Sequence, residues 1–378
     1  MTVEAPPASS MKIVASRDEL ARALGVVGRA VSARISVQIL AGILLRAGEG
    51  RLTVAATDME MSLRAGLDAD VEGEGSVVVP GRLLVDIVRL LPPGEVVLNH
   101  EADAATLEVT AGTGSYRLNT YRADDFPRLP ELDASGLVEV PREALLDTIA
   151  KVARAASRDE SWPVLTGILV RLEGAGIVMA ATDSYRLAVK ETPLEQAVGR
   201  DFEAIVPARA LGELVRIGQG ANTAEIGVGV QENQVLFDVD GVLLTARRID
   251  GQFPNFRQLR PESFEAEINV PREELLDAVR RVSVMAQRNA PLRLRFEEGG
   301  LTIQAQSQDV GEATESLPIP YNGDLLEIGF NPDFLREGLE SVEEEQVRLR
   351  LITPLRPGLI SGAGEDSWYL IMPIRLAG

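Results

Sequence analysis

The chain has 378 residues, of which 45% are hydrophobic and 25% charged, and its formal net charge is −19. This length exceeds what a single hydrophobic core usually organises, so two or three domains are expected. No apolar run is long enough for a membrane-spanning helix, and a chain without cysteine has neither disulfides nor thiolate metal sites. The opening segment, residues 1–10, lacks the basic start and apolar core of a signal peptide, so we interpret it as a disordered leader of a cytoplasmic protein.

One sequence unit occurs three times in the chain. Its first segment reads SRDELARALGVVGRAVS from Ser16, PREALLDTIAKVARAAS from Pro141 and PREELLDAVRRVSVMAQ from Pro271. Other markers recur at similar spacing, and they are Arg17, Arg142 and Arg272; Asp58, Asp183 and Asp309; and Pro80, Pro207 and Pro332. Self-similarity at a period of about 125 residues, a common domain size, predicts three tandem domains. We place them at residues 11–134, 135–263 and 264–378.

Each copy is predicted to hold a strand, a helix, a strand pair around a glycine turn, and a further strand and helix. The clearest hairpin is GILVRLEGAGIVMAAT, residues 167–182, in which β-branched residues flank a Gly-rich turn. Proline-rich joints separate the copies, and both contain a Phe-Pro pair, Phe126-Pro127 and Phe253-Pro254. Two helices packed on antiparallel sheets, three times over, make an α+β fold.

The first helix of each copy is predicted to carry an apolar stripe. In the first copy the stripe residues fall within about 60° of arc at 100° per residue. The three stripes are Leu20, Leu24, Val27 and Val31; Leu145, Ile149, Val152 and Ala156; and Leu275, Val279, Val282 and Ala286. Basic residues lie about opposite the stripes, and they are Arg22, Arg29, Lys151, Arg154, Arg158, Arg280, Arg281 and Arg288.

Positive charge is concentrated in five predicted helical segments. Segments 17–34, 142–158, 272–288, 81–91 and 208–219 together carry a net charge of +7, which leaves −26 for the rest of the chain. A solvated helix face should take the acidic average of this protein, so one shared sign on equivalent helices indicates a common positive surface. DNA phosphates are the expected partner, and such contacts carry no sequence information. The second helix of the third copy departs, with Phe334 and Ser341 where the others have arginine.

The size of one copy indicates how many copies surround a duplex. A domain of about 125 residues has an equivalent radius of roughly 18 Å, so six domains in a ring leave a hole of about 36 Å. Three domains leave only about 6 Å, far less than the roughly 20 Å width of B-DNA. A three-domain chain is therefore expected to dimerise head to tail in order to enclose DNA.

The triplicated unit, the first-helix pattern and the C-terminal MPIRL resemble the bacterial DNA sliding clamps, the β subunits of the replicative DNA polymerase, along nearly all of residues 11–376. The resemblance implies three clamp domains in a head-to-tail homodimeric ring, with helices lining the hole and sheets outside. It implies a processivity factor without catalytic residues, metal or cofactor. The expected partners are duplex DNA, the polymerase catalytic subunit, the clamp loader, and other polymerases and repair proteins with short clamp-binding peptides, in a nucleoid-associated location.

The resemblance also implies a peptide-binding pocket between the second and third domains. The family's TDxxRL element reads Thr182-Asp183-Ser184-Tyr185-Arg186-Leu187. The hydrophobic floor matches Leu165, Leu187 and Leu259 with Pro254, and the C-terminal wall matches Leu370, Ile371, Met372, Pro373, Ile374, Arg375 and Leu376. Two departures leave the peptide affinity open: Gln258 stands at an often basic position, and Ala377-Gly378 extend past the usual terminal leucine.

DNA contacts and a dimer interface are carried over in the same way. The DNA-contact candidates carried over from the family are Arg34, in the loop after the first helix, and Arg158, which lies near a family polar contact that reads Asp159 here. Arg209 lies close to a third contact position. The helical wheel adds Arg22, Arg29, Lys151, Arg154, Arg281 and Arg288 as candidates. The dimer interface would join the first domain of one chain to the third domain of the other, near Tyr116 and Val284.

Comparison of the copies separates structural from functional residues. The aspartate of the TD pair recurs in all three copies, so it is expected to form a turn. Tyr185, Arg186 and Leu187 have no counterpart in the other copies, which favours a functional role. The MPIRL segment is also compatible with a plain last strand, although an exposed apolar cluster without a partner promotes aggregation.

Two other functions remain compatible with the sequence. A metal-dependent nuclease needs only carboxylates, but the chain has one histidine, His100, and short glycine turns in place of a phosphate-binding loop. A protein-only scaffold would use the acidic surface. Magnesium-dependent cleavage of DNA would identify the nuclease. Retention on circular DNA that is lost on linearisation would exclude the scaffold.

Overall fold

The computed structural model describes residues 10–32, 37–101, 104–130, 136–286, 290–307, 309 and 311–376. It is an α+β protein in which helices pack on antiparallel sheets, as predicted. The chain forms two compact units, residues 1–142 with 213–248 and residues 143–212 with 249–378, and each unit is described by itself. Across the described ranges, no helix combines the length and the apolarity needed to cross a bilayer.

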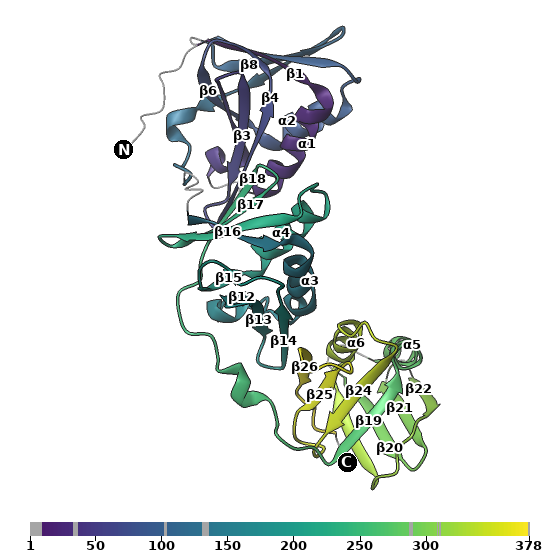
Figure 1. Ribbon diagram of the computed structural model, residues 1–378. Coiled ribbons are helices and arrows are strands. Elements are labelled where there is room, and N and C mark those ends of the chain that lie inside the picture. The colour runs from purple at the N-terminus through teal and green to yellow at the C-terminus, as the bar shows by residue number, and fades with distance from the viewer. Residues whose placement is uncertain are drawn as a thin grey trace. The chain divides into compact units, whose positions relative to one another are not determined.

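Each copy of the repeat has the same order of main elements: a strand, a helix, four strands, a second helix and three strands (Figure 1). The first copy contains β1 (Met11–Ser16), α1 (Arg17–Val27), β2 (Gly42–Gly48), β3 (Arg51–Thr57), β4 (Met61–Asp68), β6 (Gly75–Pro80), α2 (Gly81–Leu90), β7 (Glu95–His100), β8 (Thr106–Ala111) and β9 (Gly114–Asn119), with short strands β5 (Asp70–Glu72) and β10 (Tyr121–Arg122). The second contains β11 (Val138–Pro141), α3 (Arg142–Val152), β12 (Gly167–Glu173), β13 (Gly176–Thr182), β14 (Arg186–Pro193), β15 (Phe202–Pro207), α4 (Ala208–Gln219), β16 (Glu225–Gln231), β17 (Gln234–Val239) and β18 (Val242–Arg247). The third contains β19 (Ala266–Pro271), α5 (Arg272–Ser283), β20 (Leu292–Glu297), β21 (Gly300–Ser307), β22 (Gly311–Pro318), β23 (Leu326–Phe330), α6 (Pro332–Glu340), β24 (Gln346–Leu351), β25 (Gly358–Ser361) and β26 (Ser367–Ile371).

The first unit holds two antiparallel sheets. One has the order β5-β1-β7-β8-β9 and the other the order β10-β6-β2-β3-β4-β18-β17-β16-β11. In the larger sheet, β4 of the first copy pairs with β18, the last strand of the second copy, and Met61 lies opposite Ala246. One continuous sheet therefore joins the first two copies. Among the described strands, β9 has a neighbour on one side only.

The second unit repeats this plan. Its larger sheet has the order β15-β12-β13-β14-β26-β25-β24-β19, and its smaller sheet has the order β22-β21-β20-β23. Here β14 of the second copy pairs with β26, the last strand of the third copy, and Arg186 lies opposite Ile371. The joint between successive copies is thus built in the same way in both units. The strand β22 ends its sheet, with β21 as its single neighbour among the strands described.

Burial of the first helices follows the predicted stripes. Leu20, Leu24 and Val27 of α1 are fully buried, and so are the equivalent residues of α3 and α5. Their apolar side chains drive the helices onto the sheets because each buried side chain of this size stabilises the fold by about 1.5–3 kcal/mol. The last residue of the third stripe, Ala286, is only half-buried, whereas its equivalents Val31 and Ala156 are buried.

The first helices are shorter than the predicted segments 17–34 and 142–158. In the first two copies the α-helix passes into a single 3-10 turn, Gly28–Ala30 and Ala153–Ala155, and the next residue is extended. Arg158 therefore lies in a loop after the helix.

In the third copy α5 lies beside α6 (Figure 1).

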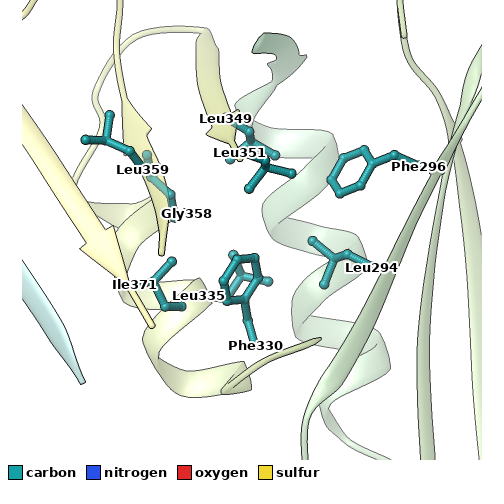
Figure 2. A pocket seen from close by; sticks show the side chains of 10 residues that line it. Leu294, Phe296, Phe330, Leu335, Leu349, Leu351, Gly358, Leu359 and Ile371 are labelled. Atoms are coloured by element: carbon teal, nitrogen blue, oxygen red, sulfur yellow. The ribbon is translucent and has the colours of Figure 1, made fainter. Parts of the chain in front are cut away.

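A small cavity lies in the core of the third copy, between its two sheets and α6. Phe296 and Leu294 of β20 face it from one side, and Phe330 of β23 from below (Figure 2). Its volume is about 10 Å³ and the exposed part of its lining is apolar. A space of this size admits about one water molecule, and an apolar lining offers that water no partner. We therefore regard it as a packing gap and not as a ligand site.

Candidate functional site

The turn between β13 and β14 is organised by the side chains of Thr182 and Asp183. The Thr182 hydroxyl donates to the carbonyl of Arg186 at 2.6 Å. Oδ1 of Asp183 accepts the backbone N–H groups of Tyr185 and Arg186, both at 3.0 Å. Such side-chain bonds to the local backbone shape tight turns. The turn leaves Tyr185 with 65% of its surface exposed.

The first copy has the same turn, between β3 and β4. The hydroxyl of Thr57 donates to the carbonyl of Met61, and Oδ1 of Asp58 accepts the backbone N–H groups of Glu60 and Met61. The turns even share a positive φ, 76° at Met59 and 77° at the equivalent Ser184. The prediction that the shared aspartate forms a turn is confirmed for Asp58 and Asp183.

Arg186 lies at the joint between β14 and β26, and its side chain is only 9% exposed. Its guanidinium donates to Asp183 Oδ2 at 2.9 Å, to Glu337 of α6 and to the Tyr369 hydroxyl at 3.3 Å. It also lies 4.3 Å from the centre of the Phe334 ring. We expected this side chain in the peptide pocket. Its bonds are instead used to hold β14, α6 and β26 together.

Electrostatics agree with this structural role. Burial raises the pKa of Tyr369 well above its ordinary value, although the neighbouring Arg186 opposes the rise. Burial would lower the pKa of Arg186, but Tyr369, Glu337 and Asp183 together raise it. The tyrosine therefore stays neutral and the arginine stays charged at physiological pH, so the network keeps one protonation state.

One residue of the predicted pocket floor, Leu187, and one of its predicted wall, Leu370, belong to a buried core. Leu187 and Leu370 are buried together with Phe253, Phe256 and Trp368. These aromatic residues were missed from the sequence as site residues, although the repeated Phe-Pro pair of the joints contains Phe253. Phe253 and Phe256 come from the segment between β18 and β19, so this segment packs against the β14–β26 joint.

Part of the predicted pocket remains accessible at the edge of this core. Leu259 is 49% exposed and Met372 40% exposed, and the backbone N–H of Met372 donates to the carbonyl of Tyr185 at 2.8 Å. Leu165 and Pro254 are half-buried. We call Tyr185, Leu259 and Met372 the exposed patch. An apolar ligand at this joint would contact these three side chains first.

The C-terminal segment after β26 lies against β23. The backbone N–H of Ile374 donates to the carbonyl of Gly329 at 2.7 Å, the only bridge described between this segment and a strand. Pro373, Ile374 and Leu376 are half-buried and Arg375 is exposed. The MPIRL segment is thus not the last strand itself, because β26 ends at Ile371 and the segment begins at the next residue.

Replacing Gly329 with alanine should displace this C-terminal segment. A Cβ atom at Gly329 would lie 2.7 Å from the Ile374 carbonyl oxygen and 2.7 Å from Leu376 Cδ2. Overpacking of this kind costs about 1–3 kcal/mol. We expect peptide titrations to show at least roughly tenfold weaker binding at the exposed patch. Gly300→Ala, where the added atom meets only a carbonyl at 3.9 Å, is the matched control. Equal peptide affinity in both variants would remove the segment from the site.

The predicted DNA contacts fall into two groups. Arg22 and Arg158 are exposed, and neither forms an ion pair with another residue of the described ranges; Arg209 is exposed in the first turn of α4. The second group is paired with carboxylates: Arg29 with Glu213, Lys151 with Glu343, Arg154 with Glu340 and Arg281 with Glu315. Arg34 and Arg288 lie outside the described residues.

Lys151 differs most from its prediction, because its side chain is only 12% exposed. Its ammonium group lies 2.7 Å from Glu343 Oε1 and donates to the Ser341 carbonyl at 3.0 Å. Lys151 thus holds the second and third copies together. At one of the two positions where the third copy departs from the basic pattern, the side chain has a role of its own, since the Phe334 ring packs against Arg186.

Tyr116 and Val284, predicted at a dimer interface, are both exposed. Tyr116 lies on β9, the last strand of its sheet, and is 41% exposed. Val284 follows α5 and is 79% exposed.

Within the described residues, no group of three or more His, Asp or Glu side chains is arranged to hold a metal ion, so no feature favours the nuclease.

Comparisons with known proteins cover nearly the whole length of the chain. Models of the DNA polymerase III beta subunit match three times: the N-terminal domain at residues 11–130, the central domain at 139–255 and the C-terminal domain at 257–375. The Streptomyces coelicolor beta sliding clamp is 37% identical over 381 residues, covering 97% of this chain and 100% of that protein.

Solved structures agree with these matches. The C. crescentus beta sliding clamp is 30% identical, with a TM-score of 0.92 over 98% of this chain and 100% of that one. The Bacillus subtilis sliding clamp is 28% identical, with the same TM-score of 0.92 and the same coverage, 98% and 100%. The chain therefore belongs to the DNA polymerase III beta subunit family, the beta sliding clamps, and is a processivity factor without catalytic activity of its own, as the sequence predicted.

Proposed function

We propose that two copies of this chain close head to tail into a ring around duplex DNA and tether the replicative polymerase there. The observation that carries the ring is the pairing of strands between copies. β4 of the first copy pairs with the last strand of the second copy, and β14 of the second pairs with the last strand of the third. The equivalent strands left over are β22 and β9, which both end their sheets. Pairing β22 of one chain with β9 of the other repeats the same joint.

This pairing, which we call the proposed seam, completes a regular pattern. Each joint within the chain combines four main strands of one copy with the last three strands and the first strand of the next, and the first joint also includes the short strand β10. Joining β23-β20-β21-β22 to β9-β8-β7-β1 would make a third sheet of the same plan. An unpaired edge strand otherwise invites aggregation, and closure removes it. Tyr116 on β9 and Val284 after α5 are the side chains that we assign to this seam.

The DNA contacts are proposed on the helices. Exposed arginines such as Arg22 and Arg158 offer charge to phosphates without reading bases. Arg209 in α4 is assigned to the same surface, together with the paired residues Arg29, Arg154 and Arg281. We keep Arg34 and Arg288 as predictions from the sequence. The charge segregation supports an inner surface that attracts DNA in a protein whose net charge of −19 repels it elsewhere.

The exposed patch is proposed to bind the short peptides of the polymerase, the clamp loader and repair proteins. Its three side chains are apolar or aromatic and adjoin a preformed core, as expected of a hydrophobic peptide anchor. We also propose that the protein is located in the cytoplasm at the nucleoid. We place its domain limits at residues 134/135 and 263/264.

Two measurements test this function. Light scattering should give twice the 40.7 kDa mass of one chain. Protein loaded on a nicked circular plasmid should stay bound during gel filtration and be released when the plasmid is cut to a linear form. A stable monomer, or binding that ignores the topology of the DNA, would contradict the ring and favour the protein-only scaffold. Magnesium-dependent cleavage of the plasmid would revive the nuclease.

A further inference from the structure

Two equivalent arginines among the predicted DNA contacts are each held by a glutamate of the next copy. Arg29 and Arg154 lie 125 residues apart, in the 3-10 turn that follows the first helix of their copies. Arg29 pairs with Glu213 of α4 in the second copy. Arg154 pairs with Glu340 of α6 in the third copy. The same contact therefore recurs in both units, although the two glutamates occupy different positions of their helices.

In the first unit, the carboxylate of Glu213 lies between two arginines. Its Oε2 atom is 3.7 Å from Nη1 of Arg29, and its Oε1 atom accepts a hydrogen bond from Arg216. Glu213 is buried, whereas both arginines are exposed. Oε2 has no hydrogen-bond partner among the residues described. The carboxylate therefore depends on charge attraction to guanidinium groups that remain open to solvent.

In the second unit, Glu340 binds two arginines from different copies. One oxygen accepts a hydrogen bond from Arg154, and the other accepts one from Nη2 of Arg280 at 3.0 Å. Burial opposes its ionisation, but the hydrogen bonds from Arg280 and Arg154 hold the pKa of Glu340 below its ordinary value. The carboxylate is thus ionised at neutral pH and cancels one of the two positive charges beside it.

These bonds bear directly on DNA binding. A guanidinium bonded to a carboxylate must release or share that partner before it binds a phosphate. Glu213 is buried and Glu340 half-buried, but the arginines that they bind stay open to solvent, so a DNA phosphate can approach the same guanidinium groups and compete for them. Each pair lowers the number of phosphates that the surface neutralises at any moment.

We propose that Glu213 and Glu340 are internal counterions that compete with DNA phosphates for Arg29, Arg216, Arg154 and Arg280. They thereby keep the hold of the ring on DNA weak enough for movement along it. The inference rests on the proposed function, because it requires the helices to face DNA. It adds that two acidic residues on this surface set the strength of binding.

Glu213→Gln and Glu340→Gln test the proposal, since glutamine keeps the shape of the side chain and removes its charge. Binding of a short duplex, which enters the ring from its own ends, is measured at several salt concentrations. Each variant should bind roughly tenfold more tightly at low salt, and the slope of log K against log salt should steepen by about 0.9 for each additional phosphate that the protein neutralises. Adding Arg154→Gln to Glu340→Gln should abolish this tighter binding.

The control is Glu203→Gln, which changes the net charge equally. Glu203 lies on β15 and pairs with Arg171 at 2.6 Å, away from the helices. If it tightened DNA binding as much as the other two, net charge alone would explain the effect and the proposal would be wrong. An unchanged salt slope with a lower melting temperature would make the two glutamates purely structural and also overturn it. Failure of the unaltered protein to bind duplex at any salt would instead contradict the proposed function.

Discussion

Replacing Arg186 with alanine should lower the free energy of unfolding of the second unit by about 1–3 kcal/mol, because it leaves two half-buried carboxylates without this partner. The side chain is 9% exposed and bonds to Asp183 and Glu337, whose side chains are themselves 13% and 21% exposed. It also packs on Phe334 and donates to the Tyr369 hydroxyl. Three elements, β14, α6 and β26, meet at this one guanidinium, and the strand pairing of β14 with β26 limits the loss when it is removed.

Urea denaturation followed by tryptophan fluorescence measures this loss. The chain has two tryptophans, and a Trp162→Phe background leaves Trp368, which is buried in β26 beside the joint. Arg171→Ala, which removes an exposed ion pair, should change stability by less than about 1 kcal/mol. Adding Glu337→Gln to Arg186→Ala should recover part of the loss because it removes an unpaired charge. A stability of Arg186→Ala equal to that of Arg171→Ala would show that the network does not hold the joint.

Replacing Val284 with aspartate should dissociate the proposed dimer, with a Kd raised by about 10²–10³-fold. Val284 stands at the repeat position of Arg29 and Arg154, which contact the second helix of the following copy. Across the proposed seam that helix would be α2 of the partner, with Asp86 at the position of Glu213. A carboxylate at position 284 would lose its water beside a like charge.

Val284→Arg is the matched variant, and it should keep the dimer. The new guanidinium would meet the partner's Asp86 as Arg29 meets Glu213. Light scattering at low micromolar concentration should give 40.7 kDa for Val284→Asp and twice that mass for Val284→Arg, and circular dichroism checks that both are folded. If both variants dissociated, the size of the side chain and not its charge would matter. If neither did, Val284 would not lie at the seam.

Much of the fold was predictable because it depends on local order. The recurrence of Asp58 and Asp183 identified a turn whose hydrogen bonds the structure confirms, since an aspartate caps the backbone of its own turn. The stripes of the first helices were predicted because periodicity reports which face is buried. The last three strands of each copy were missed although Pro92-Pro93-Gly94 marks a turn just before β7, because a short apolar stretch does not by itself distinguish a strand from a helix.

Sequence alone thus determined the three copies, their helical faces and the family to which they point, because each of these is written in residues close together along the chain. Only the tertiary structure decided which distant groups meet. The pairing of β14 with β26 placed Arg186 beside Glu337, 151 residues away, and Lys151 beside Glu343, so two residues predicted to bind ligands also link elements of the fold. A charged side chain takes whichever opposite charge the fold brings within a few ångströms, and no local pattern encodes that distance.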